Sequence, residues 1–301
     1  MNLRDLQYLV VLSETLNFRK ASEACYVSQP TLSMQIKKLE GELGVILFER
    51  DRRFLQITSA GVAMVACAKR ILNTVDDMKK AARGFQDPLG GSVSLGVFPS
   101  LAPYILPKII HRLDVALPEL SLSIKEKITA KCLQELYDGD LDLVMLASQV
   151  DDSMLAQHIL FEEIFYVVCS DKHPLSSLES IHPEQIPEDQ LLLLDEGHCL
   201  REQGLEYCQR IGRRHNTDIA GTSLSTVLAM VSLDRGVTLL PALSLPAVEH
   251  LPVSVKPIAV DPPSRKVSLY WRSSYERREL IECLAGVIKA GVQSVSGVVV
   301  M

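Results

Sequence analysis

The chain has 301 residues, of which 47% are hydrophobic, 23% are charged, 16 are glycine and 15 are proline. This composition excludes disordered and collagen-like chains, and the length predicts about two or three domains. A membrane helix needs roughly 20 apolar residues, but Pro241 and Pro246 interrupt the best candidate, residues 237–248. We therefore expect no contact with a membrane.

Cysteine usage favours a reducing compartment. The seven cysteines are spread along the whole chain, and an odd number cannot pair completely. Arg4 and Asp5 fall where a secretory peptide would have its apolar core. These features predict a cytoplasmic protein whose thiols stay reduced.

The charge is unevenly distributed along the chain. Residues 1–90 contain 13 Lys and Arg against 10 Asp and Glu, a net charge of +3, whereas the whole chain has −6. The first ninety residues have a helical pattern, and short β-branched runs alternate with helical stretches after the linker at 88–91. We place a domain boundary at this Pro-Leu-Gly-Gly linker.

The N-terminal segment predicts three helices with a tight break before the third. Asn17 is expected to cap a short helix over 18–25. Ser28 is expected to cap the next helix, with Pro30 in its first turn and Gly44 at its end. The predicted buried stripe of the third helix is Leu32, Ile36, Leu39 and Leu43.

A hairpin and a long helix follow. Residues 46–58 contain two short apolar strands around a charged tip, and Thr58 or Ser59 can cap a helix that runs to about Arg83. Its apolar positions include Val62, Val65, Ala66, Ile71, Leu72, Val75 and Met78. This face is extensive for a lone linker and predicts pairing with a second copy of the helix.

The third helix has the polar pattern of a DNA reader. Its predicted exposed face consists of Gln29, Thr31, Ser33, Gln35 and Lys37. Such amides and hydroxyls can bond base edges in a major groove, while Arg50, Arg52 and Arg53 can contact phosphates or a minor groove. The alternative is an ordinary solvated face of a helical bundle, because a charge of +3 is a weak electrostatic signal.

The remaining residues predict an α/β fold. The expected strands are 93–98, 120–124, 141–146, 165–170, 191–194, 237–240 and 267–271. Apolar runs that alternate with helices indicate mainly parallel sheets covered on both faces. The length favours two lobes, with chain crossings near 161–164 and 262–265.

Ligands in open α/β sheets bind beyond the carboxyl ends of the strands. This rule selects Ser100, Thr129, residues 195–199 and residues 222–223 as candidates to bind a small polar molecule. The alternative for each of these residues is plain helix capping.

Cys199 has the surroundings of a reactive cysteine. It follows His198 at a predicted helix start, with Arg201 close behind, and these features favour a thiolate. Asp195 and Glu196 act in the opposite direction.

Cys208 lies nine residues after Cys199. On one continuous helix that separation is about 13.5 Å of rise and about 900° of rotation, so the two sulfurs face opposite sides. A disulfide needs Cα atoms within roughly 7 Å, so pairing would require the helix to unwind, which Gly204 would ease. The alternatives are two unrelated cysteines, one capping a helix and one in a core, or a zinc site with His198 and His215, whose spacing matches no common pattern.

The segment FRKASEACYVSQPTLSMQIKKLEGELGVILFERDRRFLQITSAG resembles the winged helix-turn-helix of the LysR-type transcriptional regulators. The resemblance implies a winged helix-turn-helix domain at 1–58, a dimerising linker helix at 59–90 and a redox-sensing regulatory domain at 91–301. That last domain would resemble periplasmic binding proteins, with lobe I at about 91–162 and 266–301 and lobe II at about 163–265. It also implies no enzymatic activity, no cofactor, and promoter DNA, RNA polymerase and a homodimer or homotetramer as partners.

GHCLREQGLEYC and TSLSTVLAMVSLDRGVTLLPALSLP resemble the OxyR branch of this family, which senses hydrogen peroxide. The resemblance implies that Cys199 reacts with peroxide and that Cys208 is its disulfide partner. The implied peroxide pocket consists of Ser100, Thr129, His198 and Arg265. Ser100 stands where this branch usually has threonine, so the hydroxyl is kept and the methyl group is lost.

Three functions remain open from the sequence. The first is a peroxide-sensing regulator of oxidative-stress genes, switched by a reversible disulfide. The second is a regulator that senses a small metabolite in the cleft between the lobes, with the cysteines as bystanders. The third is a thiol peroxidase, against which the DNA-reading helix argues.

Overall fold

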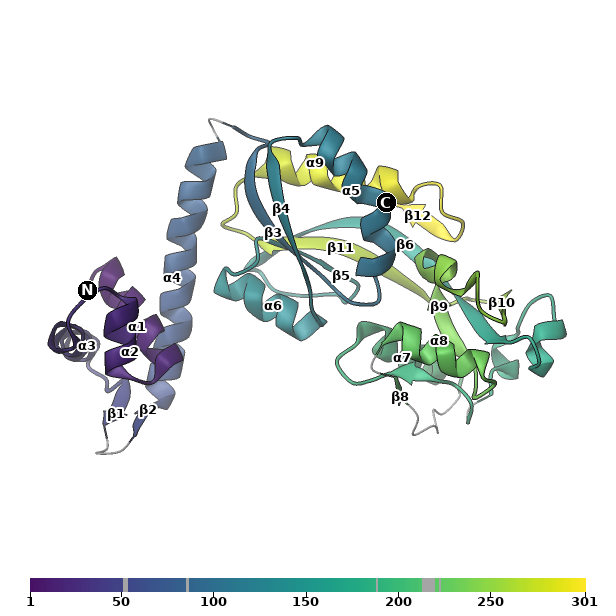
Figure 1. Ribbon diagram of the computed structural model, residues 1–301, viewed down its shortest axis with the longest axis horizontal. Coiled ribbons are helices and arrows are strands. Elements are labelled where there is room, and N and C mark those ends of the chain that lie inside the picture. Colours follow the sequence, from purple (N-terminus) through teal and green to yellow (C-terminus); the bar gives the residue numbers. More distant parts are fainter. Residues whose placement is uncertain (51–53, 85–86, 188, 213–219, 222) are drawn as a thin grey trace. The chain divides into compact units, whose positions relative to one another are not determined.

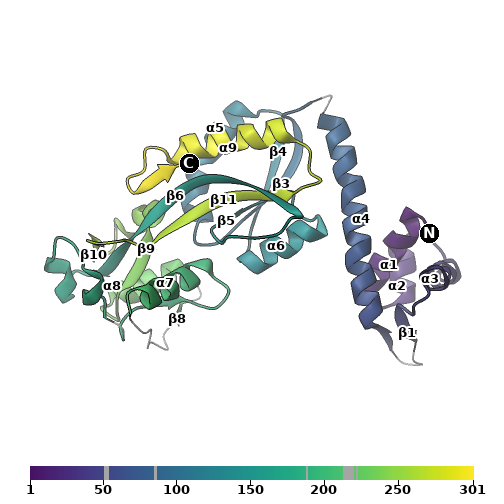
Figure 2. The same cartoon turned by 180° about the vertical axis from the view of Figure 1, so that it is seen from behind.

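The structure is a computed structural model that describes residues 1–50, 54–84, 87–187, 189–212, 220–221 and 223–301. The chain divides into two compact units, whose elements are labelled in Figures 1 and 2. The first unit comprises residues 1–83 with two short segments, 137–140 and 274–276; the second comprises 84–136, 141–273 and 277–301. The predicted domain limits at 58 and 90 stay a prediction.

The first unit has the expected order of elements. It contains α1 (Leu3–Thr15), α2 (Phe18–Ala24), α3 (Gln29–Leu43), β1 (Phe48–Arg50), β2 (Leu55–Ile57) and α4 (Ser59–Gly84). The predicted caps are confirmed: Asn17 accepts hydrogen bonds from the first turn of α2, and Ser28 accepts one from Thr31 N in α3. Gly44 ends α3 in the left-handed region, with a φ of +71°.

The core of the first unit joins all three short helices to the hairpin. Its buried residues include the predicted Leu32, Ile36 and Leu39 of α3. Part of the apolar face of α4 packs on this same core, through Met64, Val65 and Leu72 among others. Val62, Ile71 and Met78 of α4 are exposed. The predicted surface for pairing with a second copy is therefore smaller than the sequence pattern indicates.

The second unit contains one sheet of eight strands. Its path is β10 (Val253–Pro257), β6 (Leu155–Ser170), β11 (Ser264–Arg272), β5 (Leu143–Leu146), β3 (Gly91–Val97) and β4 (Leu120–Glu126), while β9 (Thr238–Pro241) and β12 (Val298–Val300) also pair with β6. Helices α5 (Ala102–Ala116) and α9 (Arg278–Val292) lie side by side on one face of this sheet, and α6 (Thr129–Asp138) lies on the other (Figures 1 and 2).

The remaining elements of this unit surround a separate core. They are α7 (Cys199–Arg210), α8 (Leu224–Ser232), β7 (Leu193–Leu194), β8 (Ala220–Gly221) and three 3-10 helices, η1 (Pro174–Ser177), η2 (Pro183–Gln185) and η3 (Ala242–Val248). Buried side chains from residues 165–258 form this core. The α/β class with an N-terminal winged helix-turn-helix and a long helix is confirmed.

The expectation of mainly parallel pairing is wrong. Only β3, β4 and β5 pair in parallel within the large sheet, whereas β6 pairs antiparallel with β9, β10, β11 and β12. The reason is that β6 is one strand of 16 residues. Its first part pairs with β11, which returns alongside it in the opposite direction, and its last part pairs with β9 and β10. The division into two lobes stays a prediction.

The last residues of the chain, for which the sequence offers no interpretation, form a strand. Val298 to Val300 pair with Phe161 to Glu163 of β6. Gly297 makes the turn into this strand with a φ of +81°, and a Cβ at this position would lie 2.9 Å from the Tyr166 hydroxyl. The turn therefore requires glycine for both conformation and space.

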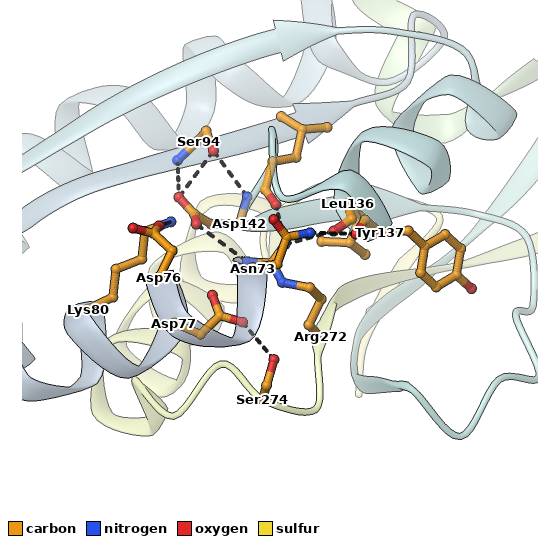
Figure 3. A network of polar contacts seen from close by, with 11 residues as sticks. Asn73, Asp76, Asp77, Lys80, Ser94, Leu136, Tyr137, Asp142, Arg272 and Ser274 are labelled. Carbon is orange, nitrogen blue, oxygen red and sulfur yellow. Dashed lines mark hydrogen bonds and ion pairs between the residues drawn. The ribbon is translucent and has the colours of Figure 1, made fainter. Parts of the chain in front are cut away.

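A buried polar network fixes the ends of α6 and β11 in the second unit (Figure 3). The Asp142 carboxylate accepts hydrogen bonds from Ser94 N at 2.9 Å and Ser94 Oγ at 3.0 Å. Arg272 Nη1 donates to the carbonyl oxygens of Leu136 at 2.7 Å and Leu141 at 2.6 Å. These bonds satisfy one carbonyl in the last turn of α6 and one just before β5, which would be costly to bury without partners.

A separate set of hydrogen bonds lies within the first unit, on the face of α4 drawn in Figure 3. Asn73 Nδ2 donates to the Tyr137 carbonyl oxygen at 2.7 Å, and Ser274 Oγ donates to Asp77 Oδ2 at 2.6 Å.

No helix in the described part of the chain has both the length and the apolarity to cross a membrane.

We predict that Gly61→Ala destabilises the protein. Gly61 lies in the first turn of α4, and an added Cβ would lie 2.3 Å from the Leu47 carbonyl oxygen and 2.6 Å from Ile57 Cγ1. Overpacking of this kind costs roughly 1–3 kcal/mol, so the midpoint of thermal unfolding should fall. Gly41→Ala in α3 is the matched control, because its Cβ would meet nothing within 4 Å. An unchanged midpoint in Gly61→Ala would show that the contact between α4 and the hairpin is looser than the structure indicates.

Candidate functional site

Three segments that are far apart in the sequence enclose a small pocket in the second unit. One follows β3, one leads into α6, and one leads into α7. The pocket is narrow: its empty volume of about 150 Å³ includes space open to solvent, and none of it is wide enough for a water-sized sphere. It is lined by Phe98, Pro99, Ser100, Ile128, Thr129, Gly197, His198 and Cys199. It therefore brings together three of the four predicted pocket residues and the predicted reactive cysteine.

Cys199 is the first residue of α7, and His198 is the residue that precedes the helix. The thiol belongs to a residue that is only 3% exposed. The amide groups of a first helical turn carry a partial positive charge, which favours an anion at this position. Arg201 does not add to this effect directly, because its Nη1 donates to the Leu194 carbonyl oxygen at 3.1 Å.

Arg265, the fourth predicted pocket residue, lies behind Ser100. Its side chain is fully buried, and its guanidinium carbon lies 5.1 Å from the ring centre of Phe98 and 5.7 Å from that of Phe165. Nη1 donates to Ser100 Oγ at 3.1 Å, and Nη2 donates to the Ser100 carbonyl oxygen at 3.2 Å. Nε donates to Glu163 Oε1 at 2.8 Å.

Opposing influences act on the pKa of Cys199. Burial is the largest and raises the pKa above its ordinary value, and the Glu202 carboxylate adds to this rise. The positive charge of Arg265 and a hydrogen bond with the Ser100 hydroxyl lower it. The net pKa is raised, so a thiol is the resting form, and Arg265 and Ser100 are the groups that stabilise the thiolate when it forms.

Thr129 supplies an unsatisfied polar atom at this pocket. Its Oγ1 is buried and finds no hydrogen-bond partner among the residues that the structure describes. A buried hydroxyl without a partner is costly unless a ligand or a water molecule bonds to it. A small molecule with hydrogen-bonding oxygens would satisfy Thr129 in the same pocket that contains the Cys199 thiol.

Cys208 lies on the same continuous helix as Cys199, as the sequence predicts. Both residues are buried, and neither is in a disulfide. Their sulfurs therefore lie on opposite faces of α7, too far apart to pair without a change in the helix. Gly204 has a packing role here, because a Cβ at this position would lie 2.7 Å from Leu193 Cδ2.

The other cysteines differ in their surroundings. Cys132 and Cys169 are fully buried, and burial raises the pKa of Cys132 to about 11. Cys25, Cys67 and Cys283 are half-buried, and Cys25 packs against the core of the first unit. Within the described residues no group of three His, Cys, Asp or Glu side chains is placed to hold a metal ion. His215, which belonged to the conceivable zinc site, lies outside the described residues.

A larger cavity of about 410 Å³ lies along β6, β11 and α7. Its polar lining includes Gln149, Glu162, Gln203, Lys266 and Tyr270. Gln203 Nε2 donates to the Ala147 carbonyl oxygen at 3.1 Å, while its buried Oε1 lacks a partner among the described residues.

The predicted DNA-reading residues lie on α3 of the first unit. Gln29, Pro30 and Lys37 are exposed, whereas Thr31, Ser33 and Gln35 are half-buried. The Thr31 hydroxyl lies 2.7 Å from the hydroxyl of Ser28, the residue that caps the helix. Arg50 ends β1, but its side chain and the whole of Arg52 and Arg53 lie outside the described residues.

Two exposed side chains beside this face were missed by the sequence interpretation. Tyr26 is 96% exposed at the break between α2 and α3, with a φ of +55°, and Met34 of α3 is 63% exposed. The tight break was recognised, but its aromatic side chain was not assigned a role. An exposed tyrosine next to a helix N-terminus is of the kind that bonds DNA phosphates.

Comparison with known proteins agrees with this arrangement. Residues 3–62 match the model of the bacterial regulatory helix-turn-helix protein of the lysR family, and residues 86–293 match the LysR substrate binding domain. The DNA-binding transcriptional dual regulator OxyR of Escherichia coli K12 is 38% identical over 296 residues, 96% of this chain and 95% of that protein. The HTH-type transcriptional regulator EstR of Acinetobacter baylyi is 34% identical over 293 residues, 96% of each.

A solved structure of full-length OxyR from Pseudomonas aeruginosa is also similar, with a TM-score of 0.79 and 34% identity. The match covers 98% of this chain and 96% of that one. Two family models and full-length relatives thus account for both units of the chain. The chain belongs to the LysR family of DNA-binding transcriptional regulators, which are not enzymes.

Proposed function

We propose that this protein is a hydrogen-peroxide-sensing regulator of oxidative-stress genes, switched by a reversible disulfide between Cys199 and Cys208. One observation carries the proposal. The Cys199 thiol shares a small pocket with the partnerless hydroxyl of Thr129, and Arg265 and Ser100 are placed to stabilise its thiolate. Relatives named for hydrogen peroxide or OxyR support it.

The first step is attack of the Cys199 thiolate on one oxygen of peroxide. The O–O bond breaks, the sulfur becomes a sulfenic acid, and the second oxygen leaves as water after it takes up a proton. Thr129 and His198, which line the pocket, are the candidates to bind the peroxide oxygens. Arg265 and Ser100 stabilise the negative sulfur before attack.

The second step joins the two cysteines. The Cys208 thiol attacks the sulfenic sulfur and releases water, which leaves a disulfide that a cellular dithiol can reduce again. Because the two residues start on opposite faces of α7, this step requires the helix to unwind. A covalent change of a few atoms is thereby converted into refolding of a segment, which is a common basis of protein switches.

The DNA-binding unit would respond through the assembly. We infer a homodimer or homotetramer in the cytoplasm, in which refolding near α7 changes how the regulatory units pack and how the paired α3 helices are spaced on promoter DNA. RNA polymerase is the expected partner of the DNA-bound protein. The predicted domains 1–58, 59–90 and 91–301 are part of this proposal.

A metabolite-sensing regulator is the second candidate, favoured by the cavity of about 410 Å³ along β6 and β11. Its size suits a small polar ligand. EstR, whose name does not mention hydrogen peroxide, is also similar to this chain, at 34% identity. Here the cysteines would be bystanders, and Cys199→Ser would leave induction intact.

We predict that peroxide treatment of the reduced, full-length protein produces a disulfide between Cys199 and Cys208. Peptide mapping by mass spectrometry after thiol blocking detects it. Cys208→Ser should stop at a Cys199 sulfenic acid, and Cys199→Ser should not react. Cys283→Ser, a change at another half-buried cysteine, is the control and should still form the disulfide. If both thiols stay reduced at peroxide concentrations that oxidise a known sensor, the mechanism fails.

We expect the rate of Cys199 oxidation to rise with pH through the neutral range, because burial raises the pKa of this thiol and the thiolate is the reactive form. Ser100→Ala removes a hydrogen bond to the thiolate, and such bonds to charged groups are worth roughly 1.5–3 kcal/mol, so the rate at neutral pH should fall by about ten- to a hundredfold. Ser100→Thr keeps the hydroxyl and should keep the rate. Equal rates in all three proteins would exclude a role for this hydroxyl.

DNA binding should depend on α3. Lys37→Ala is expected to weaken binding to the DNA upstream of the protein's own gene. It should also reduce the slope of log affinity against log salt concentration by about one, since it removes one phosphate contact. Gln29→Ala should instead relax the preference for one base, by about 1–3 kcal/mol. Lys172→Ala, an equal change of charge in the second unit, is the control in electrophoretic mobility shifts. If Lys172→Ala weakens binding as much as Lys37→Ala, α3 is not the reader.

A further inference from the structure

A fully buried ion pair lies directly behind the proposed sensing pocket. The side chains of Glu163 and Arg265 both have no exposed surface, and Arg265 Nε lies 2.8 Å from Glu163 Oε1. The two residues stand opposite each other in the antiparallel register of β6 and β11. Both oxygens of Glu163 are engaged, because Oε2 accepts a hydrogen bond from Leu243 N at 2.9 Å.

These contacts form a chain that leads to the reactive sulfur. Glu163 holds Nε of Arg265, Nη1 of Arg265 donates to Ser100 Oγ at 3.1 Å, and the Ser100 hydroxyl bonds to Cys199. Because Ser100 Oγ already accepts a hydrogen from Arg265, its own hydrogen is available to the sulfur. Arginine has a flexible stem, so the guanidinium plane needs a partner on its far side to keep this direction.

The aromatic rings around Arg265 make its bond to Glu163 more important. The Arg265 guanidinium lies over the rings of Phe98 and Phe165, which hold a cation but set no hydrogen-bond direction. The bidentate contact with Ser100 and the bond to Glu163 therefore determine where the charge lies.

We infer that Glu163 is a positioning residue for the redox site, which orients Arg265 and, through it, the Ser100 hydroxyl that bonds the Cys199 sulfur. This inference deepens the proposed function, and it concerns the reactivity of Cys199 whatever the oxidant. Glu163 lies on β6 behind Arg265, does not line the pocket and touches no reacting atom.

The groups that act on Cys199 come from several elements. They are Arg265 on β11, Ser100 after β3, and Glu202 and the Leu200 backbone in α7. His198 lines the same pocket. The charge of Arg265 also acts on Tyr104 of α5, where it opposes the rise of the Tyr104 pKa that burial causes. A change in Glu163 leaves all of these in the chain, so its effect on the thiol must pass through their positions or through the loss of its own charge.

The test measures the pH dependence of Cys199 alkylation by iodoacetamide in the reduced, full-length protein. This readout does not require peroxide sensing, so the inference and the proposed function can fail separately. Glu163→Asp keeps the charge but withdraws the carboxylate by one methylene group. We expect its alkylation midpoint to move to higher pH, because a displaced Arg265 stabilises the thiolate less. Glu163→Gln should move it in the same direction.

Glu162→Gln removes a charge from the neighbouring residue of β6 and is the matched control, with no shift expected. Combination with Ser100→Ala completes the test: if Glu163 acts through Ser100, Glu163→Asp should shift the midpoint clearly less in that background than in the wild type.

Three results would overturn the inference. A midpoint that falls in Glu163→Gln but stays unchanged in Glu163→Asp would show that only charge matters. A lowered unfolding temperature with an unchanged midpoint in both variants would show a purely structural role. Equal shifts with and without Ser100 would show that the path does not pass through this hydroxyl. If Glu163→Gln does not fold, Glu163→Asp alone decides, since its expected shift cannot arise from a lost charge.

Discussion

The organisation of the regulatory unit depends on one buried cation. A guanidinium removed from water is costly unless it is paired and hydrogen-bonded, and Arg265 meets this requirement with Glu163, both oxygens of Ser100 and two aromatic rings. The pair exists because β6 and β11 run side by side in opposite directions with Glu163 opposite Arg265. The pairing of these two strands therefore also places the charge that acts on Cys199.

This placement reconciles a buried cysteine with reactivity. Burial raises the pKa of Cys199, and the same burial strengthens the opposing effects of Arg265 and Ser100 because they act away from water. The resting thiol is thus protected, and its thiolate is stabilised at one end of α7 by Arg265 of β11 and Ser100 after β3. Cys208 at the other end of the same helix packs in the core formed by residues 165–258.

Local signals in the sequence were sufficient to predict the helix limits of the first unit. Asn17, Ser28 and Gly44 mark helix ends by their own backbone chemistry, and these limits need no distant partner. The pairing of β6 could not be predicted in this way, because strand direction depends on which distant segment returns beside it. Glu163 was missed for the same reason: in the sequence it is one of two adjacent glutamates, and only the register with β11 shows that it is the buried one. Ser100, Thr129 and His198 followed from the rule that ligands bind beyond the carboxyl ends of strands, whereas Arg265 followed from family resemblance.

We propose that the oxidation state of Cys199 and Cys208 controls how the protein binds DNA. The most direct measurement is a pair of DNase footprints, of reduced and of peroxide-oxidised protein, on the upstream region of its own gene. The account predicts two footprints that differ in length or spacing, with the difference abolished in Cys199→Ser. Identical footprints for reduced and fully disulfide-bonded protein would contradict it.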